Sequence, residues 1–576
     1  MKALLKLPAA LALLFALILS SCIAYVPDGA ETGDPAGTGE TGNYTDAPDT
    51  GDPEDVLPGS FSIDTDNGTV TSEGRVYTIS SEGVYRLSGV LEDGQIIVDA
   101  EDGTVTLELA GTGISCGTGA PVCAFIAGKL KIKALQGTSN RISDERPKRT
   151  AESDSSPAGA VYAACDIEFT GEGELSISAS FNNGIHSKDD IKISGIRLSV
   201  KAENNAVKGN DSVTIDSGDL KLVSLHGNGI KTENTGVSQK GRQRGNVGIS
   251  GGSLEIFSAC DGIDAAYDFI MSGDQTAVSV MTHSYSEFTP KDAMNTSKTG
   301  FGLVKSSDSA KGIKADNMIS ISGGTVKIRS MDDGLHANGA VKLENGETST
   351  GDIEISGGSF TIVCADDGMH ADGTLLITGG SIDVTESHEG LEGHNVTVED
   401  GEIRIYATDD GINATSSGQT GRDGLITVRG GRLFVEVEGR DVDGMDANGN
   451  YSQTGGFVVV SNPSANSMGT AAAVDTDGNV SVTGGTIIAL GTVPGSSGGG
   501  PGGKGPGRPG GGRFGMGGMG SGSLLPAGHV TFSGTLEAGE HEFAFGDISA
   551  KFSLKNRVTG GWIWSEGITP DGFTLR

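Results

Sequence analysis

The 576-residue chain has few aromatic side chains and few basic ones. Aromatic residues make up 5% of the sequence, whereas glycine occurs 94 times. This balance is unusual for a compact globular core and is typical of short strands joined by tight turns. The 41 lysines and arginines stand against 75 acidic residues, and the formal net charge is −34. The charge argues against a nucleic-acid partner, whose phosphates bind lysine and arginine, and it suits either cations or a solvated extracellular surface.

Beyond the first 22 residues, the sequence has no apolar run long enough to span a bilayer. Two early lysines precede an apolar run at 11–19 and then Ser20-Ser21-Cys22, which is the pattern of a secretory signal. The ending Leu19-Ser20-Ser21-Cys22 resembles the bacterial lipoprotein box, whose cysteine is acylated; the alternative is an ordinary signal peptide. We therefore expect a lipoprotein signal at 1–22, lipidation of Cys22, and an extracellular protein anchored to the cell membrane by lipid.

Cysteine is also scarce. Five cysteines follow Cys22, at positions 116, 123, 165, 260 and 364. No CxxC pair and no Cys/His metal spacing is present, so the sequence predicts no zinc site. Cys116 and Cys123 are near enough in sequence to bridge, but an odd count leaves at least one thiol free. We expect most of these cysteines to be small buried hydrophobic residues.

Composition divides the rest of the chain into four segments. Residues 23–58 are acidic and poor in apolar residues, which predicts a disordered tether. Residues 59–490 hold the repeats described below. Residues 491–523 form a Gly/Pro-rich low-complexity insertion, and 524–576 carry strand-like pieces with both tryptophans, Trp562 and Trp564. We expect this last segment to cap the fold, since open strand edges recruit other chains.

The chain repeats one acidic turn many times, as in MDDGLHAN (331–338), CADDGMHAD (364–372) and TDDGINAT (408–415). Many of the turn glycines recur at steps of 22, 21 or 33 residues, for example from Gly312 to Gly334 and from Gly411 to Gly444. Each unit also holds short alternating strands around a glycine pair, as in ISISGGTVKIRS (319–330). A unit of this length predicts an all-β parallel β-helix, a solenoid with capping strands at both ends. A leucine-rich repeat would need a Leu/Asn framework that is absent, and the Gly and β-branched content excludes helical repeats.

Stacked coils place equivalent residues in ladders about 4.8 Å apart. The residue before the turn glycine, or before Ala206 in its place, is in order Asn183, Asn205, Asn228, Asp261, Lys311, Asp333, Asp367, Glu389, Asp410 and Asp443. The residue two after it is His186, Lys208, Lys231, Asp264, Lys314, His336, His370, Glu392, Asn413 and Asp446. Between them lies an apolar residue that we expect to point inward.

The acidic rungs predict a calcium site. Two carboxylates ~5 Å apart repel by roughly 0.8 kcal/mol in water and by ~3 kcal/mol at an effective dielectric constant of 20. Ca²⁺ removes this penalty and takes six to eight oxygens in flexible geometry. The candidate ligands are Asp261, Asp264, Asp332, Asp333, Asp366, Asp367, Glu389, Glu392, Asp409, Asp410, Asp441, Asp443 and Asp446. The alternative is that Asp-Gly and Asn-Gly pairs simply suit tight turns.

The earlier coils offer amide, imidazole and lysine groups instead. Such a strip beside calcium would suit a polyanionic sugar chain, with lysine meeting carboxylates directly; the alternative is a solvated face. The candidate polysaccharide contacts are Asn183, His186, Lys208, Asn228, Lys231, Lys314, His336 and His370.

The phrases NNGIHSKDDIKISG (182–195), GNGIKTEN (227–234), DDGLHANG (332–339) and DDGMHADG (366–373) resemble the recurring turns of a known family. This family comprises bacterial extracellular carbohydrate-binding β-helix proteins first characterised in cellulolytic clostridia. The resemblance covers roughly residues 60–576. It implies a right-handed parallel β-helix like that of pectate lyases, bound calcium, and binding of cellulose-like or acidic plant polysaccharide such as polygalacturonate.

Two classes of function are compatible with these features. The first is a non-catalytic, calcium-containing polysaccharide-binding protein of the cell surface, which we favour. The second is a calcium-dependent polysaccharide lyase, which would need a basic side chain beside the metal; candidates by position are Lys208, Lys231, Lys311 and Lys314. A structural surface adhesin is a third possibility, and no motif singles out the paired acids of a hydrolase.

Overall fold

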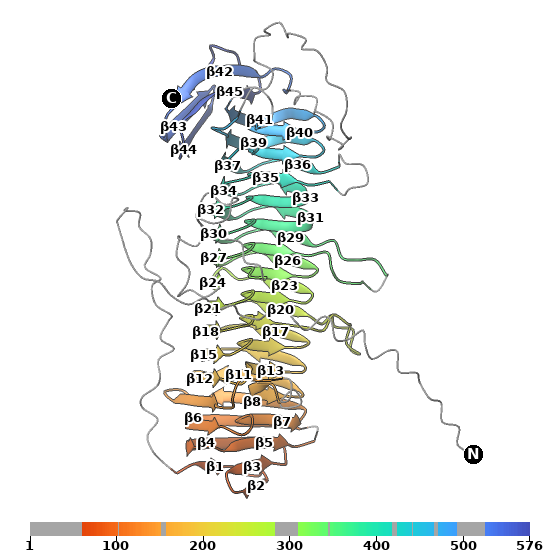
Figure 1. The fold of residues 1–576 in the computed structure, drawn as a ribbon, viewed down its shortest axis with the longest axis vertical. Helices are drawn as coiled ribbons and strands as arrows, with labels where there is room; N and C mark the ends of the chain where they lie inside the picture. The colour runs from red at the N-terminus through yellow and green to blue at the C-terminus, as the bar shows by residue number, and fades with distance from the viewer. Residues whose placement is uncertain are drawn as a thin grey trace, which may run out of the picture. The chain divides into compact units, whose positions relative to one another are not determined.

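A computed structural model describes residues 60–576, except 102, 151–156, 283–308, 344–345, 417–422, 441, 466–470 and 492–524. Cys22, the predicted signal and tether, and nearly all of the low-complexity insertion therefore lie outside the described residues. The described residues belong to one compact unit. Its described part contains strands and no α-helix, wound into a parallel β-helix (Figure 1), and this confirms the predicted fold class. Within that part, no helix has the length and apolar character to cross a membrane.

Each coil contributes strands to three faces, on which every strand pairs in parallel with its equivalent in the next coil. Face 1 consists of β3 (Val76–Ile79), β5 (Gln95–Asp99), β7 (Val122–Ile126), β10 (Gly159–Ala163), β13 (Asn183–Ser187), β16 (Val207–Gly209), β19 (Ile230–Lys231), β22 (Ile263–Ala265), β25 (Ile313–Ala315), β28 (Leu335–Ala337), the first parts of β31 (Met369–Ile377) and β33 (Leu391–Val398), β35 (Ile412–Ala414), β38 (Met445–Ala447) and β40 (Val474–Thr476).

Face 2 consists of the first parts of β4 (Gly83–Leu91) and β6 (Thr104–Cys116), then β8 (Lys129–Ala134), β11 (Asp166–Gly171), β14 (Asp190–Ile193), β17 (Ser212–Ile215), β20 (Asn246–Ile249), β23 (Asp268–Met271), β26 (Met318–Ile321), β29 (Asp352–Ile355), the second parts of β31 and β33, β36 (Leu425–Val428), and the first parts of β39 (Tyr451–Ser461) and β41 (Val480–Leu490). Face 3 consists of the second parts of β4 and β6, then β9 (Ser139–Asp144), β12 (Glu174–Ala179), β15 (Arg197–Ala202), β18 (Asp219–Ser224), β21 (Ser253–Ser258), β24 (Ala277–Thr282), β27 (Thr325–Ser330), β30 (Ser359–Cys364), β32 (Ser381–Ser387), β34 (Glu402–Ala407), β37 (Arg432–Val437), and the second parts of β39 and β41.

The alternating strands turn one side inward. On face 3, Ile328, Ile362, Val384 and Ile405 stack from β27 to β34, and each is at most 4% exposed. Full burial of such a side chain contributes about 1.5–3 kcal/mol. The same pattern in every coil makes one continuous core along the solenoid. All five described cysteines are buried and free, so the expectation of small hydrophobic residues is confirmed and Cys116 does not bridge to Cys123.

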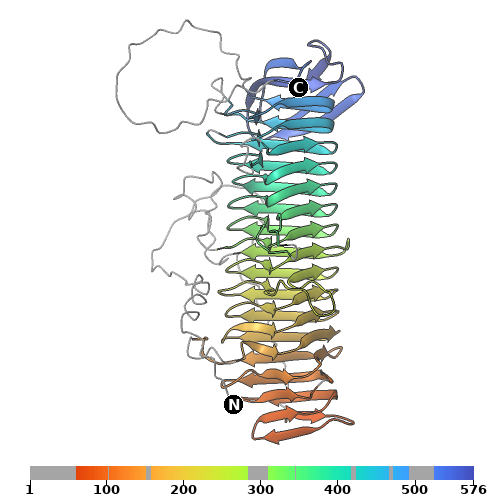
Figure 2. The same cartoon turned by 90° about the vertical axis from the view of Figure 1, so that its right-hand side faces the viewer.

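The turn glycines allow consecutive coils to approach closely. The backbone N–H of Gly334 donates to the carbonyl of Asp367, one coil further along, at 2.8 Å. A Cβ on Gly334 would lie 2.5 Å from the carbonyl oxygen of Gly368 and 2.7 Å from Cγ2 of Ile362. Glycine is therefore needed here because of close packing, and the coils stack as the even rungs seen in Figure 2.

Antiparallel strands close both ends of the stack. At the N-terminal end, β1 (Ser62–Asp64) pairs with β4, and β2 (Val70–Glu73) pairs with β3. At the other end, β45 (Val558–Ser565) pairs with β41 of the last coil and with β42 (Val530–Leu536). Trp562 and Trp564 of β45 are buried against the core, as predicted for the cap. Beside them, β43 (Gly539–Phe545), β44 (Ile548–Leu554) and β46 (Phe573–Leu575) form a small separate sheet.

Candidate functional site

The predicted ladder on face 1 is confirmed by strand pairing. Its rungs run in the order His186, Lys208, Lys231, Asp264, Lys314, His336, His370, Glu392, Asn413 and Asp446. The structure adds a rung, Asp475, which pairs with Asp446. Sequence reasoning missed this coil because Ala473 stands where the turn glycine would be.

The residue before the turn has a structural role that the sequence did not reveal. Its side-chain oxygen Oδ1 accepts the backbone N–H of the next coil at the same position, over 2.5 to 3.2 Å. The acceptors are Asn183, Asn205, Asn228, Asp261, Asp333, Asp410 and Asp443. Asparagine and aspartate are both suited to this position because each carries such an oxygen. An aspartate still has Oδ2 for another donor or a cation.

Lysines neutralise the acids of the middle coils. Lys231 and Lys314 lie on either side of Asp264 in the ladder, and both form ion pairs with its carboxylate. Although burial opposes ionisation, these two ammonium groups hold the pKa of Asp264 below its usual range. Asp261 accepts a hydrogen bond from Ser309 at 2.7 Å. Burial and the charge of Asp264 raise the pKa of Asp261.

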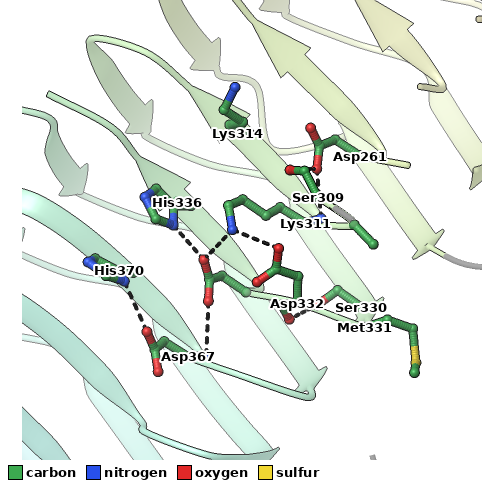
Figure 3. A network of polar contacts seen from close by, with 12 residues as sticks. Asp261, Ser309, Lys311, Lys314, Ser330, Met331, Asp332, His336, Asp367 and His370 are labelled. Carbon is green, nitrogen blue, oxygen red and sulfur yellow. Dashed lines mark hydrogen bonds and ion pairs between the residues drawn. The ribbon is translucent and has the colours of Figure 1, made fainter. Parts of the chain in front are cut away.

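Lys311 joins two further candidate calcium ligands. Its Nζ lies 2.8 Å from Oδ2 of Asp332 and 2.8 Å from Oδ2 of Asp333 (Figure 3). Burial opposes the charge on the lysine, but the two carboxylates outweigh it and raise the pKa of Lys311. The long side chain of Lys311 thus reaches from its own coil to the carboxylates of the next one.

Two aspartate–histidine pairs follow. Nδ1 of His336 lies 2.5 Å from Oδ2 of Asp333, and Nδ1 of His370 lies 2.9 Å from Oδ2 of Asp367. Glu392 adds an oxygen 3.4 Å from Nδ1 of His370. Burial opposes a charge on His370, but the hydrogen bond to Asp367 and the charge of Glu392 raise its pKa to about 9.

Carboxylates dominate the last coils. Burial and the neighbouring aspartates raise the pKa of Asp410 to about 7 and that of Asp443 to about 8. Burial and Asp475 raise the pKa of Asp446 to about 6. No lysine is among the causes of these three shifts, in contrast to Asp264. The cluster of Asp410, Asp443, Asp446 and Asp475 is here called the acidic end.

The remaining candidate calcium ligands lie between the middle coils and the acidic end. Asp366, Asp367 and His388 offer ligand atoms within 4.8 Å of one another, as do His388, Glu389 and Asp409. Asn413 donates to Oε2 of Glu389 at 3.0 Å, and burial with the charge of Asp367 raises the pKa of Glu389. Asp441 lies outside the described residues.

Several of the predicted polysaccharide contacts are buried against protein groups. Asn183 is 2% exposed and donates to the carbonyl of Ala158. Asn228 is 7% exposed and donates to Asp264. Lys208 is paired with Glu233 over 2.5 Å. These three side chains therefore support the coil stack.

The acidic end and the middle coils differ in how well their side chains suit calcium. At the acidic end, the donors are carboxylate oxygens from consecutive coils, which is the donor set that Ca²⁺ prefers. Around Asp264, Asp332 and Asp333, lysine ammonium groups already neutralise the carboxylates. The acidic end therefore fits calcium, and the middle coils do not need it.

A cavity of about 260 Å³ lies between face 3 and the small C-terminal sheet. Arg404, Tyr406, Phe434 and Lys555 contribute to its lining. Its aromatic rings are already covered by cations, with Nζ of Lys555 3.4 Å from the Tyr406 ring centre and the Arg404 guanidinium 4.9 Å from that of Phe434. A ligand in this cavity would therefore meet charged and hydrogen-bonding groups, since cations already cover the two aromatic rings.

The matching family profile and a curated relative carry the same description. A family profile described as "Carbohydrate-binding domain-containing protein" matches residues 73–352 and 348–493. A curated protein of that description from Acetivibrio thermocellus is 36% identical over 144 residues, which are 24% of this chain and 50% of the relative. The chain thus spans about half the length of that relative. A solved structure titled as a polysaccharide lyase-like protein from C. thermocellum, gadolinium derivative, is 34% identical, with a TM-score of 0.34, over 37% of this chain and 85% of that one.

Proposed function

Because the chain belongs to the family of carbohydrate-binding domain-containing proteins, we propose that it is a non-catalytic polysaccharide-binding protein of the cell surface. Its acidic end would hold Ca²⁺, and the partner would be an extended acidic plant polysaccharide. The observation that carries this proposal is the stack of Asp410, Asp443, Asp446 and Asp475 on consecutive coils, with pKa values of the first three raised by burial and mutual repulsion.

Calcium bound there would supply positive charge and open coordination positions for sugar carboxylates. The chain's own residues supply the spacing: Oδ1 of Asp410 accepts the N–H of Asp443, and Oδ1 of Asp443 accepts the N–H of Ala472. These bonds hold the carboxylates of Asp410 and Asp443 in place through Oδ1 and leave Oδ2 of each for a cation. The net charge of −34 opposes any polyanion in the absence of calcium.

Three of the four candidate lysine bases support binding over a lyase reaction. A lysine base needs a pKa near the working pH. Instead, the carboxylates around Lys231, Lys311 and Lys314 outweigh burial and raise the pKa of all three. Each ammonium group is therefore held in its charged form and is unsuited to remove a proton.

Affinity electrophoresis in gels containing polygalacturonate tests the proposal. We expect retardation that requires Ca²⁺ and weakens with NaCl, because exposed charges are screened beyond ~8 Å at physiological ionic strength. Absorbance at 235 nm, followed with the same substrate and calcium, should stay flat; a rise would establish lyase activity instead. Equal migration with and without calcium would contradict the proposal.

A matched pair of variants localises the effect. Asp410→Asn with Asp443→Asn should abolish the calcium-dependent retardation. Asp219→Asn with Asp274→Asn changes the net charge equally at two exposed positions away from the acidic end and should leave retardation intact. Equal loss in both variants would indicate a general charge effect and would contradict a localised calcium site.

A further inference from the structure

Two aspartate–histidine pairs stand one above the other on face 1. His336 and His370 are register partners on adjacent strands, β28 and β31. Their rings are stacked, with centroids 4.4 Å apart and an angle of 29° between the planes. Figure 3 shows both rings turned to the same side of the ladder. Two imidazoles from consecutive coils therefore present the same edge to the same region.

The aspartates decide which nitrogen is presented. Nδ1 of each ring is engaged by the carboxylate three residues earlier, Asp333 for His336 and Asp367 for His370. Each Nε2 therefore remains as the outward atom. Because the pKa of His370 is raised to about 9, a metal ion has to displace the proton from Nε2 of this ring. Both Nε2 atoms approach the same oxygen, Oδ1 of Asp372, at 3.9 Å from His336 and 3.6 Å from His370.

Asp372 is suited to complete a set of ligands. It follows His370 by two residues, so that the alternation of β31 places it on the same side of the strand. Its other oxygen, Oδ2, accepts the backbone N–H of Gly339 at 2.9 Å, and this bond holds Oδ1 toward the histidines. The side chain is 46% exposed, which leaves a path from solvent.

We propose that Nε2 of His336, Nε2 of His370 and Oδ1 of Asp372 form a site for a divalent transition-metal ion of the zinc class. Imidazole and carboxylate together are typical ligands of such ions, whereas Ca²⁺ takes oxygens. The carboxylates behind both imidazoles match the carboxylate–histidine–metal arrangement that orients ligating histidines. The proposal stands independently of the calcium and polysaccharide assignments.

An ion at this site requires the ligands to draw closer and the two stacked rings to rotate, because nearly parallel ring planes do not aim both Nε2 lone pairs at one point. Zinc bonds of about 2.0–2.1 Å in tetrahedral geometry place neighbouring ligand atoms roughly 3.3 Å apart. The distances from Asp372 to the two histidines exceed this by a few tenths of an ångström, within reach of side-chain rotation. Three protein ligands leave a fourth position, which water or a sugar hydroxyl can take. The sequence predicted no zinc site because its ligands come from two coils, 34 residues apart at His336 and His370, and lack a local spacing.

Titration calorimetry of the full chain with ZnCl₂, in millimolar CaCl₂, tests the site, and the absorption spectrum of added Co²⁺ reports its geometry. We expect one zinc ion per chain that calcium does not displace, and a visible Co²⁺ spectrum of tetrahedral type that zinc abolishes. Asp372→Asn retains an acceptor for Gly339 and should weaken zinc binding at least tenfold at an unchanged melting temperature. His370→Gln should remove the Co²⁺ spectrum.

His226→Gln is the control, since that ring lies near Glu203 in another coil and should leave zinc binding unchanged. The site would be overturned by zinc binding that calcium displaces completely, or by zinc binding to folded Asp372→Asn and His370→Gln equal to that of the unaltered protein. Absence of zinc binding by the unaltered protein would overturn it as well.

Discussion

Oδ1 of Asp333 accepts the backbone N–H of Asp367, one coil further along the solenoid, at 3.2 Å. The same bond links Asn183 to Asn205 and Asn205 to Asn228 in the earlier coils. The aspartate before the turn glycine thus uses Oδ1 to accept a backbone hydrogen bond. Only its second oxygen, Oδ2, is available to bind a cation or a side-chain donor. This division explains why both asparagine and aspartate occur at one position of the repeat.

The asparagine ladder gives a direct test of that structural role. Asn205→Ala leaves the buried N–H of Asn228 without its acceptor, which costs about 1–3 kcal/mol. We expect a lower urea midpoint for this variant. Asn210→Ala, at a position whose side chain contacts His186 instead of a backbone group, should change the midpoint less; equal losses would contradict a special role for the ladder.

The turn glycines predict a second effect on stability. Gly368→Ala would place a Cβ 2.5 Å from the carbonyl oxygen of Gly390. Overpacking of this kind typically costs 1–3 kcal/mol. Gly248→Ala on β20, where nothing lies within 4 Å of the added carbon, is the control and should be nearly neutral. Thermal melts of both variants check the difference, and similar melting temperatures would refute the packing argument.

Calcium should stabilise the native state. Calcium that binds only the folded chain adds about 2.7 kcal/mol to the free energy of unfolding when its free concentration is one hundred times Kd. Removal of calcium with EDTA should therefore lower the melting temperature. In Asp410→Asn with Asp443→Asn, repulsion at the acidic end is relieved, and we expect a higher melting temperature in EDTA together with a smaller gain from calcium. An unaltered protein that melts identically in EDTA and in calcium would argue against any calcium site.

His186 should make the fold sensitive to acid. Burial and the charge of Lys208 lower its pKa to about 4. The groups around it are Tyr162, Lys188, Lys208, Asn210 and Glu233. The ordinary histidine pKa of about 6.5 applies to the unfolded chain, so the unfolded state binds the extra proton between pH 6.5 and 4. This histidine's contribution to stability is therefore present above pH 6.5 and is lost toward pH 4, by at most about 1.4 kcal/mol per pH unit.

The variant His186→Gln isolates this contribution. It should show a smaller drop in melting temperature between pH 7 and pH 5 than the unaltered protein. His541→Gln, in the C-terminal sheet, serves as the control for loss of a histidine elsewhere. Parallel pH curves for His186→Gln and the unaltered protein would refute the effect.

The lipoprotein prediction concerns residues outside the described part of the chain. Cys22→Ala should move the protein from the membrane fraction to the soluble fraction after cell breakage, because acylation of the thiol is lost. Labelling with a radioactive fatty acid provides the direct readout. Retention of Cys22→Ala in the membrane fraction would contradict the lipid anchor.

The fold and the register of the ladder could be predicted because glycine spacing and strand alternation report on the backbone. Aligning the turn glycines placed Lys314, His336 and His370 on consecutive rungs, as the strand pairing confirms. The missed rung at Asp475 shows the limit of that approach: Ala473 fits where glycine usually stands, and the motif disappears although the coil remains.

Contacts made by long side chains could not be predicted in the same way. The sequence places Lys311 in one turn and Asp332 and Asp333 in the next, but the repeat does not specify which way a flexible ammonium group will reach. The role of Asp372 was missed for a related reason. Its approach to two histidines from different coils depends on the side-chain directions of three residues.

The backbone bonds between coils, such as that from Gly334 to Asp367, run along the long axis of the solenoid. A pulling force along this axis therefore loads the coils in series, and each coil carries the whole force. Failure would begin at an end and proceed one coil at a time. A 22-residue step, such as Gly312 to Gly334, would release about 70–80 Å of extended chain. A protein built this way would yield to tension by lengthening in steps before its whole fold is lost.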